Sequence, residues 1–204
     1  MYECWGKRAS DIILGILLLI LFAPVMAVVA LAVWGALGRP LLFRQTRVGR
    51  GGEQFLLLKF RSMAPGEAPD AARLGSFGRR LRTGALDELP QLWQVLRGQM
   101  SLVGPRPLLP EDFCQYSPRQ RSRVRVRPGL TGLAQIAGRN AVPWEARLEL
   151  DAIYAARVTA RGDLAILCRT PPLLLFGRGA SAPGAATMPR FADVNSLSNR
   201  EKIP

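Results

Sequence analysis

The sequence contains no histidine among its 204 residues, and it has only three cysteines. Without histidine, a serine–histidine triad, a histidine general base and a zinc or iron site built on imidazole are all excluded. The cysteines Cys4, Cys114 and Cys168 lie too far apart for a CxxC motif, and their odd number argues against a disulfide framework. Carboxylates and cysteines must therefore carry any acid, base or nucleophile role, in a body that we expect to face a reducing cytosol.

Negative charge is scarce as well. The chain has 28 Lys and Arg residues against 15 Asp and Glu, a formal net charge of +13, and 25 of the cations are arginines. Such an excess predicts an anionic partner. Few aromatic residues accompany the arginines, so base stacking is unsupported and we expect no nucleic acid. The length and the 49% hydrophobic content suit one domain with a sizeable core.

The longest hydrophobic run extends from Ile12 to Gly38 and contains no charged residue. Its 27 residues exceed the roughly 20 that a helix needs to cross a bilayer. Pro24 lies near its centre, where a missing N–H and a ring clash predict a break at Ala23 and Pro24. Basic residues flank both ends, which favours a re-entrant helix that enters one leaflet and returns. A proline-kinked full span fits these residues equally well.

The rest of the chain is typical of an α+β fold that is mostly helical. Two short strands, Leu41–Arg47 and Gln54–Met63, flank a glycine-rich turn and predict a β-hairpin. Helical spacing predicts helices over Leu86–Leu96 and Asn140–Arg157. The apolar stretch Asp163–Phe176 is interrupted by prolines, so we expect a broken segment that lies in the membrane interface.

Two adjacent carboxylates, Asp87 and Glu88, lie at the predicted start of the first of these helices. The helix macrodipole and nearby arginines would keep such a carboxylate ionised. An ionised aspartate can act as a nucleophile and form an acyl phosphate, while the neighbouring glutamate can hold a divalent cation that bridges phosphates. The alternative is a pair that only caps the helix.

Candidate phosphate ligands surround these carboxylates in sequence, because arginine suits bidentate contacts with phosphate. Two prolines fix the backbone beside Arg106 and pre-position its guanidinium. For each candidate the alternative is a solvated surface cation. The candidates are Lys59, Arg61, Arg79, Arg80, Arg82 and Arg106.

A second basic feature runs from Arg119 to Arg127, where an arginine recurs at every second position. An extended conformation would place these five cations on one face. Anionic lipid headgroups are their natural partners beside a membrane segment. The alternatives are a nucleic-acid stripe or plain solvation.

Several motifs in order between Lys7 and Phe176 closely resemble those of the small monotopic polyprenyl-phosphate phosphoglycosyl transferases, the bacterial sugar transferase family. The sequence departs from the usual family pattern at Ala23, Gln99, Leu133 and Ala137. The matching motifs are Lys7–Asp11, Lys59–Met63, Leu86–Gln91, Ser101–Pro107, Val126–Gly132, Gly138–Asn140 and Glu149–Asp151.

The resemblance implies an enzyme that moves a sugar 1-phosphate from a UDP-sugar to undecaprenyl phosphate, the first membrane step of bacterial glycan assembly. Asp87 would attack the sugar-bearing phosphorus, release UMP and form an aspartyl phosphosugar. Glu88 and Asp87 would hold Mg²⁺. The substrate-binding residues implied by the resemblance, taken with the cations above, are Lys59, Arg61, Arg82, Arg106, Arg139 and Asp151.

The resemblance also implies a location on the cytosolic face of the bacterial inner membrane, with membrane lipids as partners and a homodimer compatible with the sequence. We therefore expect three parts. Residues 1–40 form a re-entrant membrane helix with a central break, and residues 41–176 form one cytosol-facing catalytic domain with interfacial amphipathic helices. Residues 177–204 form a disordered tail, because half of them are Gly, Ala, Ser or Pro.

A function of a different class also fits the composition. A non-catalytic membrane anchor or scaffold could bind acidic lipids through its arginines, with binding that weakens steeply as salt is added. Such a protein would release no nucleotide from any donor, whereas the enzyme would. No motif in the sequence identifies the sugar, because sugar discrimination depends on a few pocket contacts.

The re-entrant topology predicts that both flanks of the hydrophobic run face the cytosol. Single cysteines placed at residues 2 and 45, in a background without the three native cysteines, should react with an impermeant thiol reagent only after the inner leaflet is opened. Labelling of either position from outside intact cells would establish a full span instead.

Overall fold

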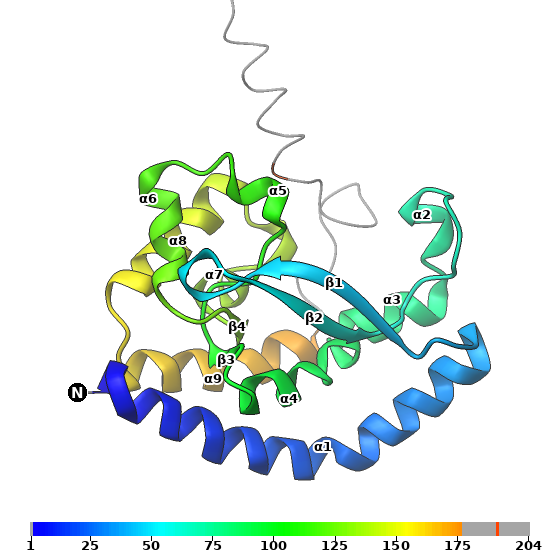
Figure 1. The fold of residues 1–204 in the computed structure, drawn as a ribbon. Coiled ribbons are helices and arrows are strands. Elements are labelled where there is room, and N and C mark those ends of the chain that lie inside the picture. Colours follow the sequence, from blue (N-terminus) through cyan, green and yellow to red (C-terminus); the bar gives the residue numbers. More distant parts are fainter. Residues whose placement is uncertain (1, 177–190, 192–204) are drawn as a thin grey trace, which may run out of the picture.

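The computed structural model describes residues 2–176 and residue 191. Within these residues, helices surround a β-hairpin and a second, smaller strand pair (Figure 1). The expected class, α+β and mostly helical, is confirmed. The predicted disordered tail over residues 177–204 lies, apart from residue 191, outside the described residues.

The hydrophobic run forms one long helix. A π-helical turn, Tyr2–Gly6, leads into α1, Lys7–Leu37, which is long and apolar enough to cross a membrane. The predicted break at Ala23 and Pro24 is wrong, because α1 continues through Pro24. An interior proline removes one N–H donor and displaces one carbonyl, which bends a helix whose other hydrogen bonds persist. Figure 1 shows α1 bending near its middle, with both ends turned toward the rest of the chain.

Most apolar side chains of α1 do not pack on the protein. Ile20 and Val28 are 68% and 66% exposed, whereas Val29 and Val33 on the inner face are buried. Only 11% of the most apolar stretch of α1 is buried inside the protein. A continuous exposed apolar surface of this length is unfavourable in water. The arrangement supports membrane association of α1, with one of its faces against the domain.

Two strand pairs stand beside α1. Strand β1, Leu42–Val48, pairs antiparallel with β2, Gln54–Phe60, so the predicted hairpin is confirmed. Gly51 takes a φ of +70° in the turn, a conformation that other residues adopt only with strain. Strands β3, Ser101–Val103, and β4, Gly129–Thr131, pair in parallel. Sequence analysis missed this pair, since three residues are too few to show an alternating pattern.

The remaining helices are mostly short, and they cover the hairpin and the second strand pair. Two of them, α8 and α9, are longer than the others and lie C-terminal to the hairpin. The helices are α2 (Asp70–Arg73), α3 (Ser76–Thr83), α4 (Gln91–Leu96), α5 (Pro110–Phe113), α6 (Pro118–Arg121), α7 (Leu133–Ile136), α8 (Trp144–Ala156) and α9 (Ala160–Leu175).

Two predicted elements differ from the structure. The helix expected over Asn140–Arg157 begins only at α8, because Pro143 occupies its N-cap. The segment expected to be broken by Pro171 and Pro172 is instead the continuous helix α9. Its 16 residues are still fewer than the roughly 20 that cross a bilayer.

The arginines between Arg119 and Arg127 do not form an extended face, so that prediction is also wrong. Arg119 and Arg121 lie in α6, and Arg123 and Arg125 lie in the 3₁₀ turn Ser122–Arg125, which Arg127 follows. In a helix, side chains two positions apart point to different sides. Arg123 accordingly turns inward and is buried, whereas Arg119 forms an exposed ion pair with Glu149 at 2.5 Å.

Polar contacts tie the N-terminal end of α1 to the domain. The ammonium of Lys7 lies 2.8 Å from the carboxylate of Asp163 in α9. Asp11 accepts hydrogen bonds from the Ser101 hydroxyl at 2.9 Å and from the Leu102 N–H at 3.0 Å. These groups are buried, so the contacts hold the polar end of the helix against β3 at a site from which water is excluded.

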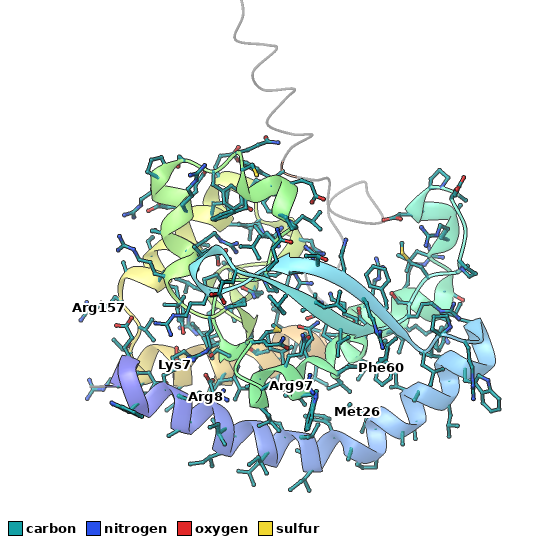
Figure 2. All side chains as sticks on the ribbon, in the orientation of Figure 1. Lys7, Arg8, Met26, Phe60, Arg97 and Arg157 are labelled. Atoms are coloured by element: carbon teal, nitrogen blue, oxygen red, sulfur yellow. The ribbon has the colours of Figure 1, made fainter. Side chains whose placement is uncertain are left out.

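The C-terminal end of α1 is held differently. The guanidinium of Arg61 donates to the carbonyl oxygens of Leu37 and Gly38, which end the helix without partners inside it. Nearer the middle of α1, Met26 packs against an apolar cluster that includes Phe60 of β2. Figure 2 labels both of these side chains. Both halves of the bent helix are thus fastened to the same domain.

Candidate active site

The two adjacent carboxylates lie in a tight turn between α3 and α4. Asp87 and Glu88 belong to the 3₁₀ turn Leu86–Glu88, which Ala85 opens with a left-handed φ of 53°. Helix α4 begins after Pro90, so the carboxylates precede its first turn and do not lie in it as predicted. No side chain caps either element, which removes the capping role as an explanation of the pair.

Glu88 is held by two cations from different elements. Its Oε1 lies 2.7 Å from the Lys59 ammonium of β2 and 2.6 Å from the Arg106 guanidinium, and a second Arg106 nitrogen lies 3.4 Å from Oε2. Burial favours the neutral acid, but the charges and hydrogen bonds of Arg106 and Lys59 outweigh it and hold the pKa of Glu88 below its usual range. Glu88 is therefore a fixed negative charge.

Asp87 has a different environment although it is the next residue. Its side chain is only 5% exposed, and among the described residues it makes no hydrogen bond or ion pair. Burial raises the pKa of Asp87, while the positive charge of Lys59 and then those of Arg82 and Arg106 oppose this rise. As predicted, the nearby cations lower the pKa of Asp87, but burial raises it by more.

Both carboxylates face a cavity of about 680 Å³ between the hairpin, α3 and α8. This volume falls within the range of small-molecule sites, roughly 300 to 1,000 Å³. Among the predicted substrate-binding residues, all except Asp151 line it. The predicted residues in its wall are Lys59, Arg61, Arg79, Arg82, Asp87, Glu88, Arg106 and Arg139, whereas the candidate Arg80 is not among the lining residues.

The cavity wall also contains residues that sequence analysis did not select. They include Arg47 on β1 and the neighbours Trp144 and Arg147 on α8. Burial lowers the pKa of Arg147 to about 10, and the same effect lowers that of Arg47 to about 10. Arg147 lies next to the buried Leu148 on the predicted helix. A cation beside core residues of a helix is unusual, and this pattern could have marked Arg147 as a functional residue.

Three of the predicted cations have structural contacts of their own. Arg139 donates from its guanidinium to the backbone carbonyls of Arg82 and Thr83, at 3.1 Å each, and so ends helix α3. Arg82 donates to the Ser62 hydroxyl at 2.9 Å. Arg61 similarly holds the end of α1. Their contacts with a substrate stay predictions, and their positions at the cavity are set by these backbone and hydroxyl contacts.

Asp151 lies behind the cavity. Its Oδ2 accepts hydrogen bonds from Arg123 at 2.6 and 3.1 Å, and the same guanidinium donates to the backbone carbonyl of Arg106 at 2.6 Å. Burial raises the pKa of Asp151, and the charge of Arg123 opposes this. Asp151 therefore acts on the cavity through Arg123, which holds the loop that carries Arg106.

The donor groups suit a magnesium ion only in part. The structure has no cluster of three or more Asp, Glu, His or Cys side chains among its described residues. Mg²⁺ commonly binds through one or two carboxylates together with substrate phosphates and water. Asp87 has no hydrogen-bond partner in the described part of the chain, and Glu88 lies beside it, so this pair fits an ion that arrives with a diphosphate.

The fold and the cavity together define a membrane-associated protein with a cation-rich site for an anionic small molecule, centred on two carboxylates. A family profile described as "Bacterial sugar transferase" matches residues 2–177. The chain therefore belongs to the bacterial sugar transferase family.

Three relatives with printed names match between 83% and 95% of the chain. The "Uncharacterized sugar transferase EpsL" of Bacillus subtilis is 39% identical over 95% of this chain and 98% of its own length. The UDP-glucose:undecaprenyl-phosphate glucose-1-phosphate transferase of Caulobacter vibrioides is 43% identical over 83% of this chain and 69% of its own. The undecaprenyl-phosphate galactose phosphotransferase of Salmonella typhimurium is 34% identical over 85% of this chain, but only 41% of that protein is covered.

The buried pair of Asp151 and Arg123 should matter more for stability than the exposed pair of Glu149 and Arg119. Asp151→Asn removes the charge that compensates a buried guanidinium, and breaking such a pair should cost about 3 kcal/mol. Unfolding in detergent by a chemical denaturant measures the difference. Glu149→Gln is the matched control and should leave the unfolding midpoint in place. Equal midpoints for both variants would contradict this interpretation of Asp151.

Proposed function

We propose that the protein transfers a sugar 1-phosphate from a UDP-sugar to undecaprenyl phosphate, with Asp87 as the nucleophile. The printed names of the Caulobacter and Salmonella relatives support this class of reaction. The main support for the nucleophile is that the two adjacent carboxylates differ in their bonding partners. Glu88 is bound by Lys59 and Arg106, whereas Asp87 faces the same cavity without a hydrogen bond from the described residues.

In the first step, a carboxylate oxygen of Asp87 attacks the phosphorus that bears the sugar. The bond between that phosphorus and the bridging oxygen of the diphosphate breaks, and UMP leaves with the electron pair. The product on the protein is an aspartyl phosphosugar. Lys59 and Arg106 stand beside the carboxylate and stabilise the charge that develops on the phosphoryl oxygens, since Glu88 holds both in position.

In the second step, a phosphate oxygen of the lipid attacks the same phosphorus. The bond to Asp87 breaks, the carboxylate is restored and the lipid leaves as a diphosphate that carries the sugar. Two displacements allow one cavity to accept a soluble donor first and an insoluble acceptor afterwards. The cavity therefore never holds the donor and the acceptor at the same time.

Mg²⁺ is the proposed cofactor. Asp87 and Glu88 are the residues that would hold it, together with the phosphates of the donor. When bound, it offsets the negative charge of the diphosphate. The residues of the chain keep their own tasks: Glu88 orients two cations, and Arg106 is held in turn by the Arg123 contact to its carbonyl.

The proposed location is the cytosolic face of the bacterial inner membrane, with α1 entering one leaflet and returning. The bend near the middle of α1 and the fastening of both helix ends to one domain support this topology. Figure 2 shows Lys7 and Arg8 at the N-terminal end of α1, and Arg61 holds its other end. The homodimer stays a prediction.

A scaffold that binds acidic lipids through its arginines is less well supported. Several of the arginines contact the protein itself, as Arg123 does with Asp151 and Arg127 does with the carbonyl of Gly98. Those around the carboxylates line a cavity of a size that suits a small molecule. A scaffold that binds lipid headgroups does not require such a cavity. A nucleotide-release assay separates the two functions, because only the enzyme releases nucleotide.

The proposed chemistry predicts a single burst of UMP. A panel of UDP-sugars with Mg²⁺ and without lipid should yield, for the correct donor, at most one equivalent of UMP and a gain in protein mass that maps to Asp87. Asp87→Asn should abolish both signals, because an amide is not a nucleophile towards phosphorus. Glu149→Gln is the control and should retain both. Turnover by Asp87→Asn would show that another group attacks the phosphorus.

The charge on Asp87 predicts a pH dependence of this burst. Burial raises the pKa of Asp87, so the rate of UMP release should fall as the pH is lowered toward that raised pKa. Lys59→Met removes a charge that lowers this pKa and should move the fall to higher pH, whereas Lys59→Arg should move it less. Quenched-flow measurement of the burst against pH tests this. An unmoved profile in Lys59→Met would contradict the role of Lys59.

A further inference from the structure

Phe191 is the one described residue in the range 177–204, and it is buried in the domain. It is only 5% exposed. Its ring meets Tyr116 and Trp144 edge to face, at centroid distances of 5.3 and 5.8 Å. Leu148 belongs to the same apolar cluster. Aromatic pairs of this geometry gain stability beyond the area that they bury, so Phe191 is a specific contact of the domain.

The Phe191 cluster shares a wall with the candidate active site. Trp144 and Leu108 belong to the cluster and also line the cavity of Asp87 and Glu88. The guanidinium carbon of Arg147 lies 4.9 Å from the centre of the Trp144 ring. Trp144 therefore contacts Phe191 and Arg147 at once, and a shift of the indole changes the position of a cation in the cavity wall.

The position of this wall indicates which substrate it meets. Figure 1 shows α5 and α8 on the side of the hairpin away from α1. Arg61, by contrast, lies in the cavity wall where the C-terminal end of α1 is held. A lipid phosphate enters from the membrane side, because its hydrocarbon chain cannot leave the bilayer. The wall formed by Trp144 and Arg147 is thus left to the soluble donor.

We propose that Phe191 is a positioning residue for the nucleotide sugar, since its packing on Trp144 holds Arg147 in the donor-binding wall of the cavity. The inference rests on the proposed function and adds to it. It assigns a part of the donor site to a residue from the chain's C-terminal region, 104 positions after Asp87 in the sequence. Phe191 itself touches no substrate and acts through Trp144.

The test uses full-length protein in which Trp144 is the only tryptophan. Trp5, Trp34 and Trp93 are exposed and can be replaced by Phe, so that Trp144 emission reports on its own surroundings. Phe191→Ala opens a cavity beside the indole, and Phe191→Leu keeps most of the apolar volume. Leu175→Ala is the control, because Leu175 is exposed at the end of α9. All variants carry the same three replacements.

Emission, affinity for UDP and steady-state kinetics are compared across these variants. In Phe191→Ala, Trp144 emission should shift to the red, and the dissociation constant for UDP and the donor KM should rise by about two- to tenfold, with the energy of the lost edge-to-face pairs as the upper limit of this effect. The acceptor KM and kcat should stay unchanged. Phe191→Leu should fall between this variant and the parent, and Leu175→Ala should match the parent.

Each contrary result has a distinct meaning. A red shift with unchanged UDP affinity and donor KM would overturn the inference, because Phe191 would then only anchor the chain. Unchanged emission in Phe191→Ala would overturn it as well, because Phe191 would not pack on Trp144. A red shift in a protein whose parent neither binds UDP nor releases UMP would reject the proposed function, and with it the donor role, while confirming the packing.

Discussion

The compensation of buried charge is the constraint on which the site depends. The side chain of Glu88 is only 12% exposed, so an ionised Glu88 needs partners, and Lys59 and Arg106 supply them at 2.7 and 2.6 Å. The same contacts hold the two cations beside Asp87. One carboxylate is thus used to fix positive charge, and this leaves its neighbour able to attack phosphorus in the proposed reaction.

The same principle extends behind the cavity. Arg123 is buried and needs Asp151, and in satisfying its remaining donors it holds the carbonyl of Arg106. Arg106 therefore receives its position from two sides, from Glu88 at the guanidinium and from Arg123 at the backbone. A shell of this kind limits how far a catalytic group can drift from its working geometry.

The membrane helix is joined to the domain by polar groups at its ends and by apolar contacts along one face. Lys7 and Asp11 hold one end, Arg61 holds the other, and Val29 and Val33 pack between them. Because Arg61 lies in the cavity wall as well, the end of α1 and the proposed phosphate site share a residue. This contact places the site next to the C-terminal end of α1, which would keep it close to the membrane surface in the proposed topology.

The amino-acid sequence alone determined the apolar helix, the hairpin, the carboxylate pair and most of the cations in the cavity wall. These are local patterns, since periodicity, charge and turn residues act over a few positions. The tertiary structure decided which carboxylate is paired, that Asp151 acts through Arg123, and that α1 continues through Pro24 without a break. It also brought Phe191 to Trp144. Such outcomes depend on contacts between residues far apart in sequence, whose distances and burial only the packed chain defines.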